Sequence, residues 1–247
     1  MTPSTGSPKG IANHDAAVIG GLASKLGDLA RELQQQQDPD TLLTDIVHAA
    51  LDLIPHVADA SVSLVTGRRT VESRAASGEL PRRIDALQSE IGQGPCVDAA
   101  YDERIVRVPD LSRESRWPEF AKAAYAAGAR SMLSFQLFVE GDNLGALNLY
   151  GDDVNIFDEE SEQVGLLVAA HAAVAFSGAQ EISQLNQALG TRDLIGQAKG
   201  ILMERFKISP QQAFHILTRA SSDTNIKLRD VADHLASSGE ILTRKGS

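Results

Sequence analysis

The sequence predicts an α+β fold, in which an antiparallel sheet with packed helices is followed by a long helix and a small three-helix all-α domain. Near both ends of the chain, apolar residues recur at three- and four-residue steps, the period of amphipathic helices. Between these regions, short runs alternate apolar and polar residues and are separated by turn sequences, a pattern typical of hairpins. Strands in the middle and helices at both ends favour an antiparallel sheet covered by helices.

Length and composition exclude several classes of protein. The 247 residues, 43% of them hydrophobic, can form two ordinary domains or a large one, and they exclude wholesale disorder. Cys96 is the only cysteine, which excludes a disulfide framework and a Cys-rich zinc site. No unbroken apolar run reaches the roughly 18–20 residues of a membrane span, and the first fifteen residues lack the apolar region of a secretory signal. We therefore expect a cytoplasmic protein with no membrane partner.

Charge is distributed unevenly along the chain. From Gly190 to Ser247, nine Lys/Arg against six Asp/Glu leave a formal charge of +3. Because the whole chain has a net charge of −10, the first 189 residues carry −13. An acidic body with a mildly basic end is compatible with a sensor joined to a nucleic-acid-binding region. The excess is modest, and on charge alone a chance distribution is the simpler explanation. Aromatic residues make up only 4% of the chain, which argues against a base-stacking surface built from many rings.

The first half of the chain has clear helix and strand signals. We expect a helix from Asp15 to about Leu33, and a second helix that Asp38 caps, that begins at Pro39 and that ends near Pro55. Alternation predicts a half-buried strand over 60–65 and a hairpin partner over 70–76. Further strands are expected at 104–108, 131–139 and 144–150, with helices at 82–88 and 114–127; Gly128 is a left-handed cap of the last helix.

A long helix is predicted from Asp158 to Leu189. Apolar or small residues recur along it with a weak heptad spacing at Val168, Ala175, Ile182 and Leu189, and between them at His171, Gly178 and Leu185. The helix can lie on the sheet, or it can form a dimeric coiled coil. We expect the first half to pack on the sheet and the second half to pair with a second chain.

The last 58 residues predict three short amphipathic helices. Ser209, Pro210 and Gln212 form a capping box at the start of the second helix, and Asn225 can cap the third. Gly200 suggests a close approach by another helix. Five cations lie off the apolar stripes and are our candidate phosphate contacts: Arg192, Lys199, Arg219, Lys227 and Arg229. Arg192 and Lys199 are two turns apart, about 10 Å along the axis. This arrangement suits DNA and RNA equally.

Residues 191–203, TRDLIGQAKGILM, resemble the opening of an ANTAR domain, and the resemblance continues through AFHILTRAS at 213–221, then Asn225, Leu228 and Val231-Ala232. It implies an RNA-binding three-helix domain that acts in bacterial transcription antitermination, where it holds a paired-hexaloop hairpin so that a terminator cannot form. The five cations are then the expected RNA contacts. The following residues are expected to form the core: Ala198, Leu202, Ala213, Leu217, Val231 and Ala232.

Residues 38–178 resemble a GAF domain, a sensory α+β module, of the kind joined to ANTAR domains in actinobacterial regulators. The resemblance rests on IGQGPCVDA at 91–99, VPDL at 108–111, RWP at 116–118, GARS at 128–131 and GALNLY at 145–150. It implies a pocket on one face of the sheet for an unknown small ligand, and a helical frame suited to dimerisation. Cys96 and Trp117 are our candidate pocket residues, although both residue types are also common in cores. Gly92-Gln93-Gly94 can cradle a phosphate or simply form a turn.

We therefore predict an RNA-binding antitermination regulator that works as a homodimer, joined through its helices and linker, and binds leader-transcript hairpins. The expected division is a disordered leader (1–12), a GAF sensory domain with its N-terminal helix (13–178), a coiled-coil linker (179–190), an ANTAR domain (191–240) and a disordered tail (241–247). A ligand-sensing DNA-binding regulator is the alternative. No catalytic triad, carboxylate pair or histidine spacing in the sequence indicates an enzyme, a metal site or a cofactor.

Overall fold

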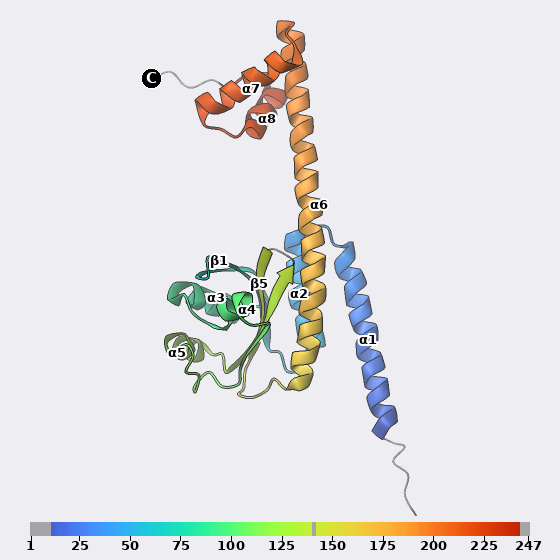
Figure 1. Cartoon of the computed structure of the whole chain (residues 1–247), viewed down its shortest axis with the longest axis vertical. Helices are drawn as coiled ribbons and strands as arrows, with labels where there is room; N and C mark the ends of the chain where they lie inside the picture. The colour runs from blue at the N-terminus through green and yellow to red at the C-terminus, as the bar shows by residue number, and fades with distance from the viewer. Residues whose placement is uncertain (1–10, 140–141, 243–247) are drawn as a thin grey trace, which may run out of the picture. The chain divides into compact units, whose positions relative to one another are not determined.

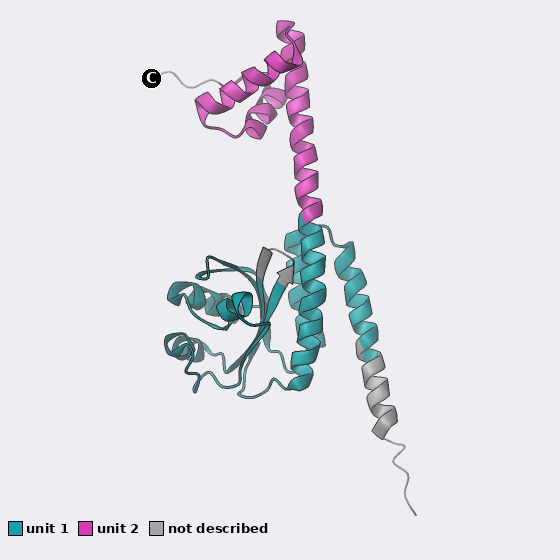
Figure 2. Ribbon diagram, viewed as in Figure 1, with its two compact units in different colours: residues 1–180 teal, residues 181–247 magenta. Residues whose placement is uncertain are grey.

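The computed structural model describes residues 11–139 and 142–242, with side chains from residue 21 apart from residues 22 and 138–144. The expected disordered segments 1–12 and 241–247 lie mostly outside this range. Backbone contacts divide the chain into two compact units, residues 1–180 (unit 1) and 181–247 (unit 2), which Figure 2 distinguishes by colour.

Unit 1 is built on a five-stranded antiparallel sheet with the order β2-β1-β5-β4-β3. The strands are β1 (Asp59–Thr66), β2 (Thr70–Ala76), β3 (Ile105–Val108), β4 (Ser131–Val139) and β5 (Asp142–Gly151). The sequence predicted each of them to within two residues at either end. Together with the helices around the sheet, they confirm the predicted α+β class.

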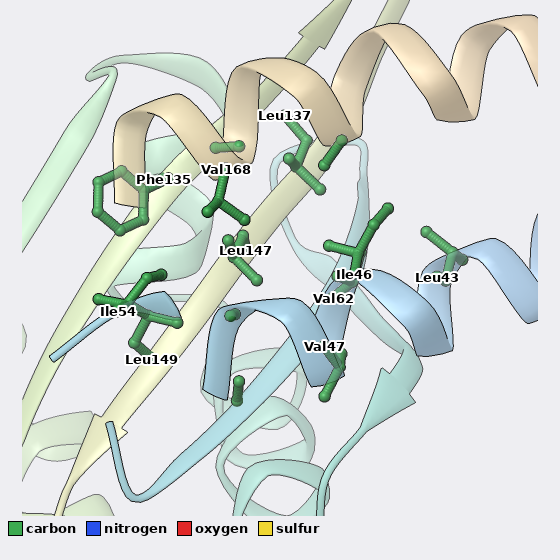
Figure 3. Packing of buried hydrophobic residues seen from close by; sticks show 14 of the residues in the cluster. Leu43, Ile46, Val47, Ile54, Val62, Phe135, Leu137, Leu147, Leu149 and Val168 are labelled. Carbon is green, nitrogen blue, oxygen red and sulfur yellow. The ribbon is translucent and has the colours of Figure 1, made fainter. Parts of the chain in front are cut away.

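One face of the sheet is covered by α2 (Pro39–Leu53) and by the first part of α6 (Glu159–Phe206), with α1 (Ile11–Gln35) packed against α2 (Figure 1). Figure 3 shows this layer, where Ile46 of α2, Leu147 of β5 and Val168 of α6 meet. Asp38 caps α2 by accepting a hydrogen bond from the Thr41 N–H at 2.8 Å, as predicted. Because Val168 is fully buried, the start of the predicted heptad seam belongs to this core.

The other face of the sheet is covered by α3 (Glu79–Ile91), α4 (Pro95–Tyr101) and α5 (Pro118–Ala127) (Figure 1). The prediction that β1 is half buried is therefore wrong. Its alternation is real, but the face that carries Ser61 and Ser63 is covered as completely as the face that carries Val62. The sequence pattern did not predict the short helix α4. It also placed the start of α5 too early, since that helix begins at Pro118.

The long helix α6 extends without a break from Glu159 to Phe206, so residues 179–190 and the first predicted helix of the C-terminal region are one element. The chain continues in α7 (Pro210–Thr224) and α8 (Leu228–Ser238). The capping box at Ser209 and Gln212 is present as predicted. Asn225 has a different position from the predicted one. It ends α7 in a left-handed conformation with φ 55°, and Lys227 stands at the cap of α8.

By length and composition alone, α6 is the one helix in the described part of the chain that could cross a membrane. The sequence contains no unbroken apolar run of that length, but an 18-residue window of α6 is apolar enough on average. Of that window, 39% is buried inside the protein. Core helices of soluble proteins are often as long and as apolar, so the feature is weak evidence for a membrane span.

Candidate nucleic-acid interface

Three helices of unit 2 position the candidate interface. The last turns of α6 pack with α7 and α8 around a small core, and every residue that the ANTAR resemblance assigned to it is fully buried. The remaining buried members are Ala220 and Leu235. Since these stripes face inward, the polar side chains between them are directed to the surface of the three-helix unit.

A groove of about 720 Å³ runs along unit 2. It brings together three of the five predicted cations, because Arg192 and Lys199 of α6 and Arg229 of α8 all line it. The other lining residues are Gln184, Gln187, Ala188, Thr191, Ile195, Gly196 and Phe214. Arg219 and Lys227 do not line this groove. Arg219 instead lies 3.7 Å from Asp223 on the exposed side of α7.

The three groove cations have no acidic partner among the described residues. Within residues 11–139 and 142–242, neither Arg192, Lys199 nor Arg229 forms an ion pair or a side-chain hydrogen bond. By contrast, Lys207 pairs with Glu204, and Arg205 donates to the Gly239 carbonyl at 2.6 Å. Unpaired cations that converge on one concave surface favour anions there, above all phosphate groups.

The groove also contains residues that the sequence analysis did not select. Phe214 of α7 is 40% exposed and lines the groove, whereas Ala213 beside it is fully buried. Thr191 and Gln187 add a hydroxyl and an amide to the same surface. One signal could have found Phe214, since it is an aromatic residue that lies off the apolar stripe of its helix. Among the described residues, no other helix packs closely on Gly200, since a Cβ there would meet nothing within 4 Å.

In unit 1, the layer between the sheet and α3 contains a buried polar cluster. The carboxylate of Asp85, 1% exposed, accepts hydrogen bonds from Ser63 Oγ at 2.8 Å and from the Tyr150 hydroxyl at 3.0 Å. Asn148 Nδ2 lies 3.4 Å from the same carboxylate, and Ser61 Oγ lies 3.1 Å from the Tyr150 oxygen. Burial raises the pKa of Asp85 above its usual value, although these hydrogen bonds oppose the shift.

The two candidate pocket residues belong to the core on this side of the sheet and are shielded from solvent. Cys96 is fully buried, and its backbone N–H donates to Gln88 Oε1 at 2.8 Å. Burial, and then the charge of Asp85, raise the pKa of the Cys96 thiol far above its usual value. Trp117 is 5% exposed and lies under the Arg116 guanidinium, whose carbon is 4.4 Å from the ring centre.

The Gly92-Gln93-Gly94 segment connects α3 to α4 and fits tightly around Gln88. Gly92 ends α3 with φ 73°, and Gly94 has φ 145°. A Cβ at Gly94 would come within 2.4 Å of Gln88 Oε1, so the position requires glycine. The packing of this segment favours its interpretation as a turn. In the described residues, no group of three or more His, Cys, Asp or Glu side chains is placed to hold a metal ion.

Comparison with protein families agrees with both units. The GAF domain family matches residues 36–177, and the ANTAR domain family matches residues 183–235. The chain belongs to the GAF family and carries an ANTAR domain. The GAF–ANTAR protein is thus a regulator of the RNA-binding, antitermination and signal-transducing kind. GAF and ANTAR are families of regulatory domains. A comparison with curated proteins found no significant match to the sequence.

Solved structures share the fold of the GAF part. The GAF domain of an Acinetobacter phosphoenolpyruvate-protein phosphotransferase is 16% identical, with a TM-score of 0.51 over 66% of this chain and 97% of that chain. A free methionine-R-sulfoxide reductase from Neisseria meningitidis is 17% identical, with a TM-score of 0.53 over 73% of this chain and 97% of that chain. At these identities the likeness is one of fold alone.

Proposed function

We propose that the GAF–ANTAR protein is a signal-controlled antiterminator. Its ANTAR domain holds paired-hexaloop hairpins of a leader transcript, as a homodimer, so that a terminator cannot form. Its GAF domain receives the signal. The observation that carries this proposal is the groove of unit 2, where Arg192, Lys199 and Arg229 converge without acidic partners among the described residues. Such a surface suits the closely spaced phosphates of a folded RNA.

Dimerisation is supported by the apolar side chains of α6 in unit 2. Ile182, Leu185 and Leu189 are 41%, 58% and 60% exposed, and they follow one another at steps of three and four residues. That spacing places them on one stripe of the helix, as in a coiled-coil seam. Two copies joined along this stripe bring two grooves to one transcript, which fits a leader that contains two hairpins.

For the GAF domain, we propose that a small ligand reaches the layer of Cys96 and Trp117. Two polar atoms fully buried in this layer, Gln88 Nε2 and Asn148 Oδ1, have no hydrogen-bond partner among the described residues. Buried polar groups normally have a partner, so these atoms are suitable contacts for a polar ligand. Native mass spectrometry of the purified protein tests this idea. A co-purifying small molecule that is lost in the Asn148→Leu variant supports it, and a ligand retained by that variant contradicts it.

The RNA assignment is tested by titrating an RNA with two six-nucleotide hairpin loops into wild type and Lys199→Ala. The variant removes one phosphate contact, so its affinity falls at low salt, and the slope of log affinity against log salt becomes shallower by about 1. Lys207→Ala is the matched control, because Lys207 is a cation of the same unit that does not line the groove.

Three outcomes contradict the assignment. The first is a Lys199→Ala affinity at low salt equal to that of wild type. The second is an equal loss in the Lys207→Ala control. The third is displacement of the RNA by excess duplex DNA, which would favour the DNA-binding alternative. An antiterminator keeps its RNA in the presence of duplex DNA.

A further inference from the structure

The groove of unit 2 contains one feature that phosphate binding does not need. Phe214 places an aromatic ring on the same concave surface as three cations. Its neighbours on α7, Ala213 and Leu217, are fully buried, whereas Phe214 is 40% exposed, so the ring lies on the flank of the helix beside the buried stripe. A single exposed apolar residue is common on protein surfaces. A ring inside a basic groove of about 720 Å³ is a more specific arrangement.

We propose that Phe214 is the floor of a subsite for one unpaired RNA base. The base stacks on the ring, while Arg192, Lys199 and Arg229 hold the phosphates on either side of it. This inference rests on the proposed function, since it names the part of the RNA that enters the groove. One ring gives one stacking position, which agrees with the low aromatic content of the chain.

The chemistry of the lining selects a base from a loop rather than from a helix. Bases in an A-form helix are stacked on one another and present no free face, whereas loop bases can be splayed out onto an aromatic side chain. Stacking is tolerant of sequence, because every base has a flat π-face. Thr191 and Gln187 line the same groove and supply a hydroxyl and an amide for the edge of the bound base.

Stacking and phosphate contact differ in their response to salt, and that difference makes the subsite testable. Release of counterions accompanies each phosphate contact and steepens the salt dependence of binding. A neutral ring releases none. Loss of Phe214 therefore weakens binding by a similar factor at every salt concentration, whereas loss of Lys199 makes the salt dependence shallower.

The experiment compares wild type, Phe214→Ala, Phe214→Leu and Phe214→Tyr. Each binds the two-hairpin RNA over a series of salt concentrations, with 2-aminopurine replacing each loop base in turn. We expect Phe214→Ala and Phe214→Leu to bind about 5- to 150-fold more weakly with an unchanged salt slope. Phe214→Tyr keeps the ring and retains wild-type affinity. At one loop position, the fluorescence of 2-aminopurine is quenched when wild type or Phe214→Tyr binds, and it is not quenched when Phe214→Ala or Phe214→Leu binds.

Phe206→Ala is the matched control. Phe206 is another exposed phenylalanine of unit 2, 50% exposed, and it does not line the groove, so its loss leaves the affinity unchanged. Phe214→Leu keeps most of the apolar volume and guards against a folding defect, which circular dichroism of each variant also measures.

The failures of the two proposals are distinguishable. Wild type that binds no hairpin RNA overturns the proposed function, and the subsite with it. The subsite alone is overturned if wild type binds but Phe214→Leu binds equally well. It is also overturned if Phe214→Leu changes the salt slope, or if Phe206→Ala is as damaging.

Discussion

At the scale of single residues, the charge state of Cys96 determines its chemistry. The thiolate is the reactive form of cysteine, and burial beside the Asp85 carboxyl raises the pKa of this thiol. A lone cysteine can act as a redox switch or can simply pack as a small hydrophobic residue. Its full burial and its raised pKa favour the second interpretation.

We expect native protein at pH 8 to react with Ellman's reagent only as fast as it unfolds. Addition of urea should release one rapidly reacting thiol per chain, because Cys96 is the only cysteine. The absorbance of the coloured thiolate that the reagent releases, followed with and without urea, measures the labelling rates of the unfolded and the native protein. Rapid labelling of the native protein would contradict this prediction and restore the redox interpretation.

Asp85 gives the stability of unit 1 a defined pH dependence. Its pKa is raised in the folded protein, so the folded state binds the proton more tightly than the unfolded state does. Stability is therefore lost as the pH rises from about 4 through the folded pKa of Asp85. We expect the Asp85→Asn variant to gain stability relative to wild type as the pH increases over this range.

Urea denaturation of wild type and Asp85→Asn at several pH values between 4 and 8 measures this difference. Comparison of the two proteins at each pH cancels the contributions of the other carboxylates. A difference that stays constant with pH, or that shrinks as the pH rises, would show that Asp85 is ionised in the folded protein as readily as in the unfolded chain.

At the scale of elements, substitutions at two glycines inside α6 can distinguish effects on helix stability from effects on RNA binding. A Cβ at Gly196 or at Gly200 would meet no atom within 4 Å, and only Gly196 lines the groove. Replacement of either by Ala should raise the free energy of unfolding of unit 2 by up to about 1 kcal/mol, because glycine is a poor helix former.

We expect Gly196→Ala alone to weaken RNA binding, since its methyl group enters the groove, and Gly200→Ala to leave it unchanged. Thermal unfolding and RNA titration of the two variants provide the measurements. An affinity loss in Gly200→Ala that exceeds the loss in Gly196→Ala would show that the RNA contacts another side of α6.

Local chemistry explains which elements could be predicted. Asp38, Ser209 and Gln212 fix the starts of α2 and α7, because these side chains bond to nearby backbone groups. Pro39 adds to the first of these signals, since its fixed φ suits the first position of a helix. The helix α4 was missed because seven residues are too few to show a period. Asn225 was misassigned because asparagine suits both the start of a helix and the left-handed end of one.

The candidate site was predictable only in part, for a related reason. Helical spacing alone placed Arg192 and Lys199 on one side of α6. That Arg229 joins them, while Arg219 does not line the groove, depends on how three helices pack. The same packing brings Phe214 beside the cations. The closed second face of the sheet is likewise a tertiary feature, which the pattern of β1 does not contain.

At the scale of the whole molecule, the exposed stripe of α6 in unit 2 predicts the assembly state. We expect wild type to sediment as a dimer and Leu185→Asp to sediment as a monomer, since the substitution places a charge in the seam. Leu185 is 58% exposed, so its replacement should not unfold the chain. Ser183→Asp adds the same charge to α6 away from this stripe and should remain dimeric.

The monomeric variant should also lose the advantage of a two-hairpin RNA over a one-hairpin RNA. The affinity of two linked binding events exceeds the affinity of a single event by about 10²- to 10⁴-fold. Sedimentation velocity and titration of both RNAs give the two measurements. A wild-type protein that is monomeric at concentrations where it binds RNA fully would contradict the dimer.

Half of the eight buried residues in the core of unit 2 are alanine: Ala198, Ala213, Ala220 and Ala232. This small core buries less apolar area than the cores of unit 1, which contain phenylalanine and leucine on both faces of the sheet. Burial of apolar area away from water is the main source of folding stability. Unit 2 should therefore unfold at a lower temperature than unit 1. A heat shock would then release the transcript while the sensor is still intact, and antitermination would cease below the temperature at which signal reception fails.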